Sequence, residues 1–336
     1  MSPRVTMRDV GLLAGVSHQT VSRVLNEPHR VNEETRKRVI EAMKSLRYHR
    51  STVARALATN RSNNLGLIST GVALHSHSKR MLAFNEAARA SGYQVSMVSL
   101  IAADKNAMQS EIDLLLGQGI EGIVFIMADK AAFGIIDSLD IDVPFVVADH
   151  GGSATMHSVA IDIYLGARMA TAHLADLGHQ NIAHVAGPDW SIDASERVRG
   201  WAAELETRAL ELPEILYGDW SPTSGYRAGL KLAADRSVTA VFCANDRMAL
   251  GVLHAFADSG VLVPEQVSVV GIDDIPESAH FIPPLTTIRQ DIDRLGLDML
   301  AKLLSFIEGS ATADPVHNEP ELIVRKSTAP HPGPHP

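Results

Sequence analysis

The stretch VTMRDVGLLAGVSHQTVSRVLN, residues 5–26, contains two short helical patterns separated by a turn. Helices are expected over residues 7–14 and 18–26, and Gly15 between them suits the left-handed backbone of a tight turn. Two helices joined in this way form a helix-turn-helix, whose second helix enters the major groove of DNA. The stretch therefore predicts a small all-α head that binds double-stranded DNA.

Capping signals and apolar spacing set the ends and the buried faces of these helices. Thr6 and Asp9 have the spacing of a capping box, and Ser17 is suited to cap the second helix. A third helix is expected over residues 33–48, with Asn32 as its cap. The side chains expected to face inward recur at helical spacing and are Val10, Leu13, Ala14, Val21, Val24, Leu25, Val39, Met43 and Leu46.

The second helix has an outer face of hydrogen-bonding side chains, and the segment around it is basic. Residues 1–61 hold twelve Lys and Arg against five Asp and Glu, a net charge of +7, whereas the other 18 basic and 34 acidic residues give −16. A basic head on an acidic body favours a polyanionic partner for the head alone, although a solvated basic surface also explains the charge. The polar outer face suits contacts with base edges and consists of Ser17, His18, Gln19, Ser22, Arg23 and Asn26.

Composition indicates a soluble globular protein of two or three domains, with 336 residues of which 46% are hydrophobic and 21% charged. The single cysteine, Cys243, lies in the apolar run AVFCAN and is expected to be a buried strand thiol. The N-terminus lacks the apolar core of a signal peptide, and no apolar run is long enough to span a bilayer. We expect a cytoplasmic protein, associated with the nucleoid through its head.

Beyond residue 64 the pattern changes to apolar strands that alternate with helical stretches such as 78–92 and 107–119. Continuous apolar strands separated by helices predict parallel α/β sheets covered on both faces, and about 265 residues suggest two lobes. The fold class is therefore an all-α helix-turn-helix head followed by a two-lobed α/β body. The expected strands are residues 65–70, 93–100, 121–127, 144–149, 181–187, 239–245 and 267–273.

Further motifs in the body extend the pattern of the head. They are VALHS (72–76), ADLGHQNIAHVAGP (175–188), YGDWSPTSG (217–225), CANDRMALG (243–251), SVVGIDD (268–274) and IPPLTTIRQD (282–291). With these stretches the chain resembles the lac repressor family of bacterial transcriptional regulators, from about residue 5 to residue 328. GDWS and IPPLTTI place the resemblance in the branch close to the lac repressor itself.

The resemblance implies a domain organisation. Residues 1–50 would be the DNA-binding head, 51–62 a hinge helix and linker, and 63–330 a periplasmic-binding-protein-like domain that binds an effector and dimerises. Lobe 1 is expected at about 63–161 and 291–320, and lobe 2 at about 162–290 and 321–330. The Pro-rich residues 331–336 are expected to be disordered. The chain ends without the C-terminal leucine-heptad helix of the family's tetramers, so a homodimer is expected.

The resemblance also implies that the paired heads read a roughly palindromic operator. His18, Gln19 and Arg23 would read the major groove, because Arg suits the O6/N7 edge of guanine and Gln suits adenine. Most other positions would hold phosphates, which fixes register without reading sequence. The DNA-binding residues implied are Thr6, Met7, Arg8, Ser17, His18, Gln19, Thr20, Ser22, Arg23, Asn26, Arg30, Thr35, Tyr48, Ser51, Ala54, Leu57 and Ala58.

Leu57 has a distinct expected role. It lies in VARALAT, where Ala54 and Ala58 are small enough for two helices to approach closely. It resembles the family's hinge leucine, which enters the minor groove and wedges a base step. A leucine packed on the body is the alternative explanation.

A second site is expected in the body, where Asp149, Asn245 and Asp273 end predicted strands. Polar residues at the carboxyl ends of parallel strands border the crevice where α/β proteins bind ligands, although such residues are also common helix caps. Arg197 and Trp220 match family positions in that cleft, and together these groups suit a sugar ring. The effector-binding residues implied are Leu74, Ser76, His77, Asp149, Ile161, Ser191, Asp193, Arg197, Trp220, Asn245, Asp273 and Ile292.

The chain departs from the lac repressor around this cleft. The stretch SLIAADKN (99–106) has no arginine where the lac repressor carries one, and His77 stands where proline is expected. Ile161 and Ile292 replace cleft phenylalanines, and Ile272 replaces a tyrosine. The expected effector is a pyranose or small glycoside, with its identity and its sense, inducer or corepressor, left open.

Three other functions remain as alternatives. A nucleoside or purine effector in the same family is nearest, and a sugar solute-binding protein shares the two-lobed body but not the basic head. An enzyme is third: Asp149 with Asp273 could suggest a glycosidase pair, yet no nucleophile motif or phosphate-binding loop accompanies them. The fifteen histidines are scattered, His331 and His335 in the tail do not make a metal site, and no cofactor is expected.

Overall fold

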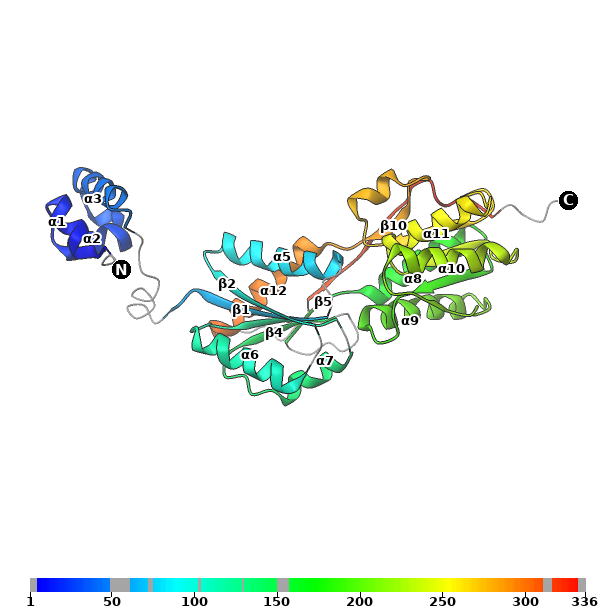
Figure 1. Ribbon diagram of the computed structural model, residues 1–336, viewed down its shortest axis with the longest axis horizontal. Helices are drawn as coiled ribbons and strands as arrows, with labels where there is room; N and C mark the ends of the chain where they lie inside the picture. The colour runs from blue at the N-terminus through cyan, green and yellow to red at the C-terminus, as the bar shows by residue number, and fades with distance from the viewer. Residues whose placement is uncertain are drawn as a thin grey trace. The chain divides into compact units, whose positions relative to one another are not determined.

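A computed structural model of the chain describes residues 5–48, 61–71, 75–101, 104–128, 130–149, 157–310 and 316–331. Its contacts divide the chain into two units, Met1–Ser62 and Asn63–Pro336, which we call the head and the body (Figure 1). Residues Ser51, Ala54, Leu57 and Ala58 of the expected hinge lie outside the described residues. No described helix combines the length and the apolar character needed to cross a membrane.

The head is an all-α unit, as predicted. Its elements are α1 (Met7–Ala14), α2 (His18–Asn26), the 3-10 turn η1 (Pro28–Arg30) and α3 (Glu33–Ser45). The Thr6–Asp9 capping box is present, Ser17 and Asn32 cap α2 and α3, and Gly15 has the expected positive φ of 64°. A small apolar core forms from buried Val10, Ala14, Val21, Val24, Val39 and Ala42.

Two details of the head differ from the prediction. Leu13 is 56% exposed, because α1 turns Val10, Gly11 and Ala14 toward the core and thereby places Leu13 outside that stripe. The third helix ends at Ser45 and not at residue 48, since Arg47 has a φ of 47°, which a helix cannot contain.

The first lobe of the body is built on a six-stranded sheet of order β11-β5-β4-β3-β1-β2, in which every pairing is parallel. The strands are β1 (Asn64–Thr70), β2 (Gln94–Leu100), β3 (Ile123–Ile126), β4 (Phe145–Asp149), β5 (Ser158–Ile161) and β11 (Val316–Asn318). The helices are α5 (His75–Ala90), α6 (Lys105–Gly117), α7 (Lys130–Ile135), η2 (Ile136–Ser138) and α12 (Ile292–Ile307). We call this sheet with its helices lobe 1.

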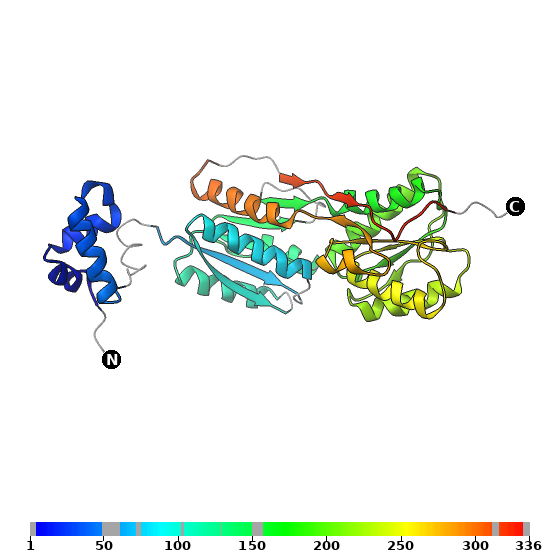
Figure 2. The ribbon, with the colours of Figure 1, turned by 90° about the horizontal axis from the view of Figure 1, so that it is seen from above.

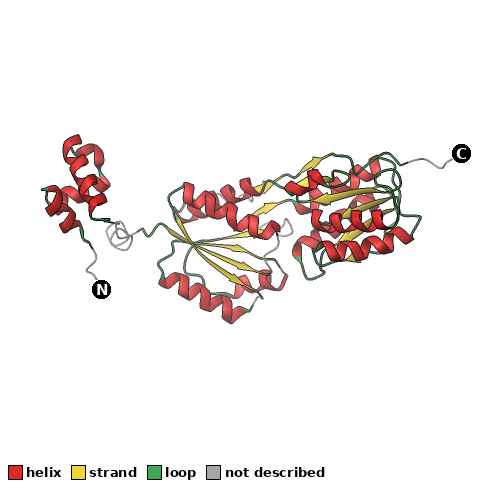
Figure 3. Ribbon diagram, turned by 45° about the horizontal axis from the view of Figure 1, so that its top comes forward, coloured by secondary structure: helices red, strands yellow, loops and turns green. Residues whose placement is uncertain are grey.

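Helices cover both faces of the lobe 1 sheet (Figure 3). On one face, Phe84 of α5 and Leu295 of α12 pack with Leu67 of β1. On the other, Ile112 of α6 packs with Phe125 of β3. Both faces of the inner strands β1 and β3 are thus buried, which explains their continuous apolar runs in the sequence, whereas β2 at the edge of the sheet is partly exposed.

The second lobe has a six-stranded sheet of order β12-β10-β9-β8-β6-β7, parallel except where β12 pairs antiparallel with β10. The strands are β6 (Ile182–Ala186), β7 (Leu216–Tyr217), β8 (Ala240–Cys243), β9 (Ser268–Ile272), β10 (Thr286–Arg289) and β12 (Glu321–Ile323). The helices are α8 (Ile163–Asp176), α9 (Ile192–Thr207), α10 (Pro222–Ala234), α11 (Asp246–Asp258) and η3 (Pro276–His280). This sheet with its helices is lobe 2.

Helices α8 and α9 cover one face of the lobe 2 sheet, and α10 and α11 cover the other. Cys243 lies in the core of β8 as expected, fully buried, and burial raises the pKa of its thiol. The chain crosses between the lobes three times, after β5, after β10 and after β11, so each lobe contains segments far apart in the sequence (Figure 2).

Candidate functional site

The outer face of α2 is polar, as the sequence predicts, because its apolar residues Val21 and Val24 are buried in the head core. His18, Gln19 and Arg23 are exposed on it. A hollow of about 470 Å³ lies along this face and continues to η1. It is lined by Gln19, Ser22, Arg23, Asn26, Glu27 and Arg30, so five of the predicted DNA-binding residues are brought together.

Hydrogen bonds already orient part of this surface. The amide of Asn26 donates to the hydroxyl of Ser22 at 3.2 Å, and Arg30 pairs with Glu27 at 3.1 Å. The latter pair is solvent-exposed, so it contributes little stability and leaves Arg30 available to a phosphate.

Several other predicted DNA-binding residues have structural roles in the head. Thr6 accepts from the backbone of Asp9 and donates to its carboxylate at 2.7 Å, and Ser17 accepts from the backbone of Thr20 at 3.1 Å. Tyr48 and Met7 are half-buried against the head core, and Thr35 is half-buried in the first turn of α3. Arg8 is exposed.

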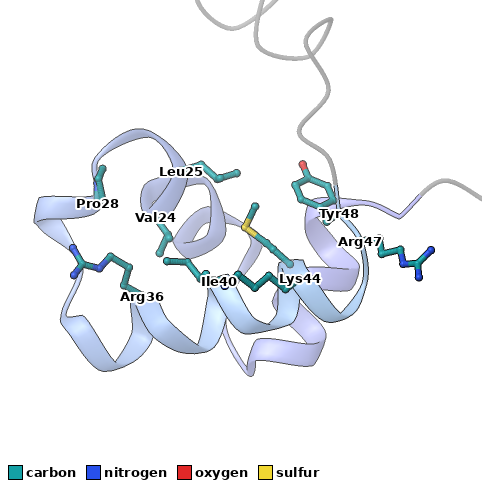
Figure 4. Close-up of a pocket in the computed structure, with 9 residues that line it drawn as sticks. Val24, Leu25, Pro28, Arg36, Ile40, Lys44, Arg47 and Tyr48 are labelled. Carbon is teal, nitrogen blue, oxygen red and sulfur yellow. The ribbon is translucent and has the colours of Figure 1, made fainter.

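The head has a second hollow that is largely apolar (Figure 4). It has a volume of about 570 Å³ and lies between α2 and α3, next to Tyr48. Val24, Leu25, Ile40 and Met43 provide its apolar surface, and basic side chains border it. The hollow uses a different side of α2 from the polar face, since it contains none of His18, Gln19 or Arg23.

In the body, Arg197 of α9 is the centre of a buried polar cluster. Its guanidinium is 2% exposed and lies 3.7 Å from the carboxylate of Asp193 and 3.6 Å from that of Asp273. It also donates to the carbonyl of Ala244 and lies over the ring of Trp220, 5.1 Å from the ring centroid. We call Asp193, Arg197, Trp220, Asn245 and Asp273 the Arg197 cluster; all five are predicted effector-binding residues.

Local structure explains how lobe 2 presents these side chains. Ser191 caps α9, which places Asp193 and Arg197 one turn apart on the same side of the helix. Asp273 follows β9, at the carboxyl end of the sheet where α/β proteins bind ligands. Asp273 and Asp274 have positive φ values of 115° and 47°, so the chain turns sharply at this point.

Trp220 is held by its backbone and by a glycine. It has a φ of 69°, and its carbonyl accepts from the amide of Asn245 at 3.3 Å. A Cβ on Gly187 would come within 2.3 Å of the indole, so only glycine leaves room for this ring. Asn245 also caps α11 by accepting from the backbone of Met248 at 2.8 Å. It thus has the helix-cap role that was the alternative to effector binding for a polar residue at a strand end.

The structure describes only some of the predicted effector-binding residues of lobe 1. Ile161 and Ile292 are 2% and 3% exposed and belong to the apolar core of lobe 1. His77 is buried near the start of α5. Leu74, and the side chains of Ser76 and Asp149, lie outside the described part of the chain.

Two residues near the cluster were not predicted from the sequence. Asp246 is fully buried, and its carboxylate accepts from the hydroxyl of Thr287 and the backbone of Ile275. Burial, and then the charge of Asp273, raises the pKa of Asp246 well above its ordinary value. Gln290, where the chain leaves lobe 2 for lobe 1, is 4% exposed, and its Oε1 has no hydrogen-bond partner within the described residues.

Metal chemistry finds no support in the described residues, which contain no group of three or more His, Cys, Asp or Glu side chains arranged to hold an ion. His184 lies in the same lobe but packs between Trp201 and Phe242, and burial lowers its pKa to about 4. The Arg197 cluster therefore offers hydrogen-bonding groups and an aromatic ring to a ligand.

Comparisons with known proteins cover both units. The family model for bacterial regulatory proteins of the lacI family matches residues 6–51, and that for a periplasmic binding protein-like domain matches residues 171–328. The chain is 35% identical over 327 residues to the lactose operon repressor of Escherichia coli K12, covering 96% of this chain and 91% of that protein. It is also 35% identical over 333 residues to the transcriptional repressor PurR of Glaesserella parasuis, covering 96% and 98%. Among solved structures, the lac repressor dimer bound to operator and the anti-inducer ONPF has a TM-score of 0.87 and 34% identity, over 97% of this chain and 100% of that one.

Proposed function

This chain belongs to the lacI family of DNA-binding transcriptional repressors, and from that membership we propose a specific mode of action. The protein binds a pseudo-palindromic operator as a homodimer, and a small sugar or glycoside bound between its two lobes controls operator affinity. It acts in the cytoplasm, where the chromosome lies, and it performs no catalysis. The observation that carries the DNA-binding part is the exposed polar face of α2 above a fully apolar inner face.

On the DNA side, α2 lies in the major groove. His18, Gln19 and Arg23 reach base edges, and each good bidentate contact discriminates against a wrong base by about 1–3 kcal/mol. Most of the other predicted residues of the head, among them Ser17, Asn26 and Arg30, hold phosphates and set the register. Leu57 of each protomer enters the minor groove and wedges one base step, which bends the duplex.

On the ligand side, the Arg197 cluster supplies the contacts of lobe 2. Asp273 and Asp193 accept hydrogen bonds from hydroxyls, Arg197 donates to them, and the Trp220 ring faces the apolar side of a pyranose. Carboxylates accept only and guanidinium groups donate only, so a ring rich in hydroxyls, which do both, satisfies them best. Ligand binding favours one arrangement of the lobes and thereby separates or joins the hinge segments of the dimer.

The energy demanded of the ligand is moderate. Moving a two-state equilibrium from 1:99 to 99:1 needs about 5.5 kcal/mol of differential binding. Two ligand sites in a dimer share this demand. The similarity to the lac repressor favours a ligand that releases DNA.

A purine or nucleoside is the second candidate effector, because a relative of equal identity is a PurR repressor. The Arg197 cluster favours the sugar, because its two carboxylates and its guanidinium suit a ring rich in hydroxyls.

The test is a two-step screen. Thermal unfolding of the full chain is measured with glucose, galactose, cellobiose, isopropyl thiogalactoside, hypoxanthine and guanine. Fluorescence-anisotropy titrations of an operator selected from random duplexes follow, with and without each compound that binds. We expect at least one sugar to raise the unfolding temperature and to shift operator affinity. A response to the purines alone would favour the second candidate effector. Failure to select any duplex from the random pool would refute sequence-specific DNA binding.

A further inference from the structure

A buried arginine of lobe 1 makes direct contact with the Arg197 cluster of lobe 2. Arg80 belongs to α5, a helix that packs on α12 and on the lobe 1 sheet. It is only 3% exposed, and its guanidinium lies 3.2 Å from the carboxylate of Asp193. Asp193 belongs to α9, which packs on α8 and β6 of lobe 2. This ion pair therefore joins the two lobes.

The pair continues into a chain of alternating charges. Asp193 lies 3.2 Å from Arg80 and 3.7 Å from Arg197, and Arg197 lies 3.6 Å from Asp273. All four side chains are at most 13% exposed. The chain thus runs from a helix of lobe 1 to the carboxyl end of β9 in lobe 2, through three of the residues proposed to bind the effector.

Burial gives the Arg80–Asp193 pair energetic weight. A solvent-exposed ion pair contributes little, but a buried charge that loses its partner leaves an uncompensated charge in a poorly solvated place. A movement that separates the lobes at this point breaks the Arg80–Asp193 contact, although Asp193 keeps Arg197 of its own helix at 3.7 Å. A ligand between the lobes can replace this contact.

We propose that Arg80 is a further effector-binding residue, supplied by lobe 1, and that the ligand group it selects is a pair of adjacent hydroxyls. The idea rests on the proposed sugar-controlled function. One hydroxyl donates to Asp193 and its neighbour accepts from Arg80, so the ligand replaces the direct contact between the two groups and the net charge of the site is unchanged. Without ligand, the direct ion pair holds the two lobes at this distance.

Arg80 also has a place in the pattern of departures from the lac repressor. The stretch SLIAADKN lacks the cleft arginine found there, whereas α5 supplies one from a different element. Lobe 1 therefore presents a guanidinium from α5, although residues 99–106, where the lac repressor carries its cleft arginine, contain none.

The ligand-free part is tested by a double-mutant cycle of Arg80→Met, Asp193→Asn and the double variant, measured as unfolding temperature of the full chain. Arg89→Met, on the exposed side of the same helix, is the matched control. Each single variant is expected to lower the unfolding temperature by about 5 °C, and the double variant by clearly less than the sum. Additive shifts, or an equal loss in Arg89→Met, would overturn the inter-lobe pair.

The ligand part uses the sugars of the screen, with isothermal titration of each sugar that binds the wild type. Arg80→Met is expected to weaken sugar binding about tenfold or more, and Arg80→Lys, which keeps the charge, to restore part of it. Unchanged affinity in Arg80→Met overturns the binding role even if the cycle shows coupling. If none of the sugars binds the wild type, the sugar effector fails and the diol proposal with it, while the cycle still decides whether the pair joins the lobes.

Discussion

The carboxylate of Asp246 lies 2.6 Å from the hydroxyl of Thr287, and its other oxygen accepts from the backbone of Ile275 at 3.0 Å. Asp246 thereby ties the start of α11 to β10 and to the turn that carries Asp273. The side chain itself is fully buried, so it acts on ligands only by holding this turn.

Asp246→Asn is expected to keep the turn, and Asp246→Ala to lose it. An amide can still accept from Ile275 and can donate to the Thr287 hydroxyl, whereas Ala leaves two buried groups unsatisfied, at a cost of about 1–3 kcal/mol in the free energy of unfolding. The raised pKa means that stability due to the protonated acid is complete below the ordinary Asp value and lost as pH rises through the folded value. Urea unfolding against pH checks both points, and Asp246→Asn should show the flatter profile.

Arg197→Met and Asp273→Ala are expected to abolish the response to ligand while operator affinity stays within about threefold of the wild type, well below the tenfold that 1.4 kcal/mol produces. The physical reason is that both side chains belong to the body and none of the predicted DNA contacts does. Arg199→Met is the control, because Arg199 lies two residues after Arg197 and thus on the opposite side of α9, where it is 54% exposed and paired with Glu196. Operator titrations with the effective sugar measure the result; a normal response in both variants would show that the ligand binds elsewhere.

Arg23→Ala and Arg30→Ala are expected to weaken DNA binding in different ways. Arg23→Ala should cost about 1–3 kcal/mol on the selected operator and relax specificity at one base pair, with little effect on random DNA. Arg30→Ala should weaken both alike and reduce the slope of affinity against salt by about one. Lys37→Ala is the control for loss of a positive charge, because the Lys37 side chain is exposed on α3 and is not a predicted DNA contact. Equal effects of Arg23→Ala on both duplexes would contradict a base contact.

Leu57→Ala is expected to leave a folded dimer that binds random DNA as the wild type does, but to weaken operator binding by a few kcal/mol, since the wedge no longer stabilises the bend. Anisotropy titrations with both duplexes give the ratio, and sedimentation confirms the oligomeric state. The same proportional loss on both duplexes would leave Leu57 as a packing residue.

Acid is expected to destabilise the body through His184. Burial lowers its pKa to about 4, below the ordinary value of 6.5, so the folded chain resists the proton that the unfolded chain takes up. Stability is complete above pH 6.5 and falls as the pH drops toward 4, by about 3 kcal/mol for this group. His184→Gln keeps a donor for the Phe242 carbonyl and should flatten this part of the profile; an unchanged slope would assign the effect to His173 and His179, whose pKa values burial also lowers.

The head could be predicted closely from sequence because its signals are local. The Thr6–Asp9 box, Ser17, Asn32 and Gly15 all act within four residues of themselves, and each has its expected role. The prediction for Leu13 was wrong, because α1 buries Val10 and Ala14 against the rest of the head and leaves both Leu12 and Leu13 exposed.

In the body, seven of the twelve described strands were predicted from their apolar runs, whereas β5, β7, β10, β11 and β12 were not. β7 and β12 have two and three residues, too few to show a pattern, and they form because neighbouring strands already present an edge. The resemblance identified Asp193, Arg197 and Asp273 together, which the structure places within one cluster. Arg80 was missed, since nothing near it in the sequence shows that α5 approaches α9.

The three crossings between the lobes have a consequence for synthesis on the ribosome. Lobe 1 begins at residue 64, yet α12 and β11, which complete its core and its sheet, are made only after residue 291. Lobe 2 likewise awaits β12, which begins at residue 321. A nascent chain can fold its head early, but neither half of the body reaches its final packing before these strands are made, so a stop before residue 316 leaves both halves unfinished.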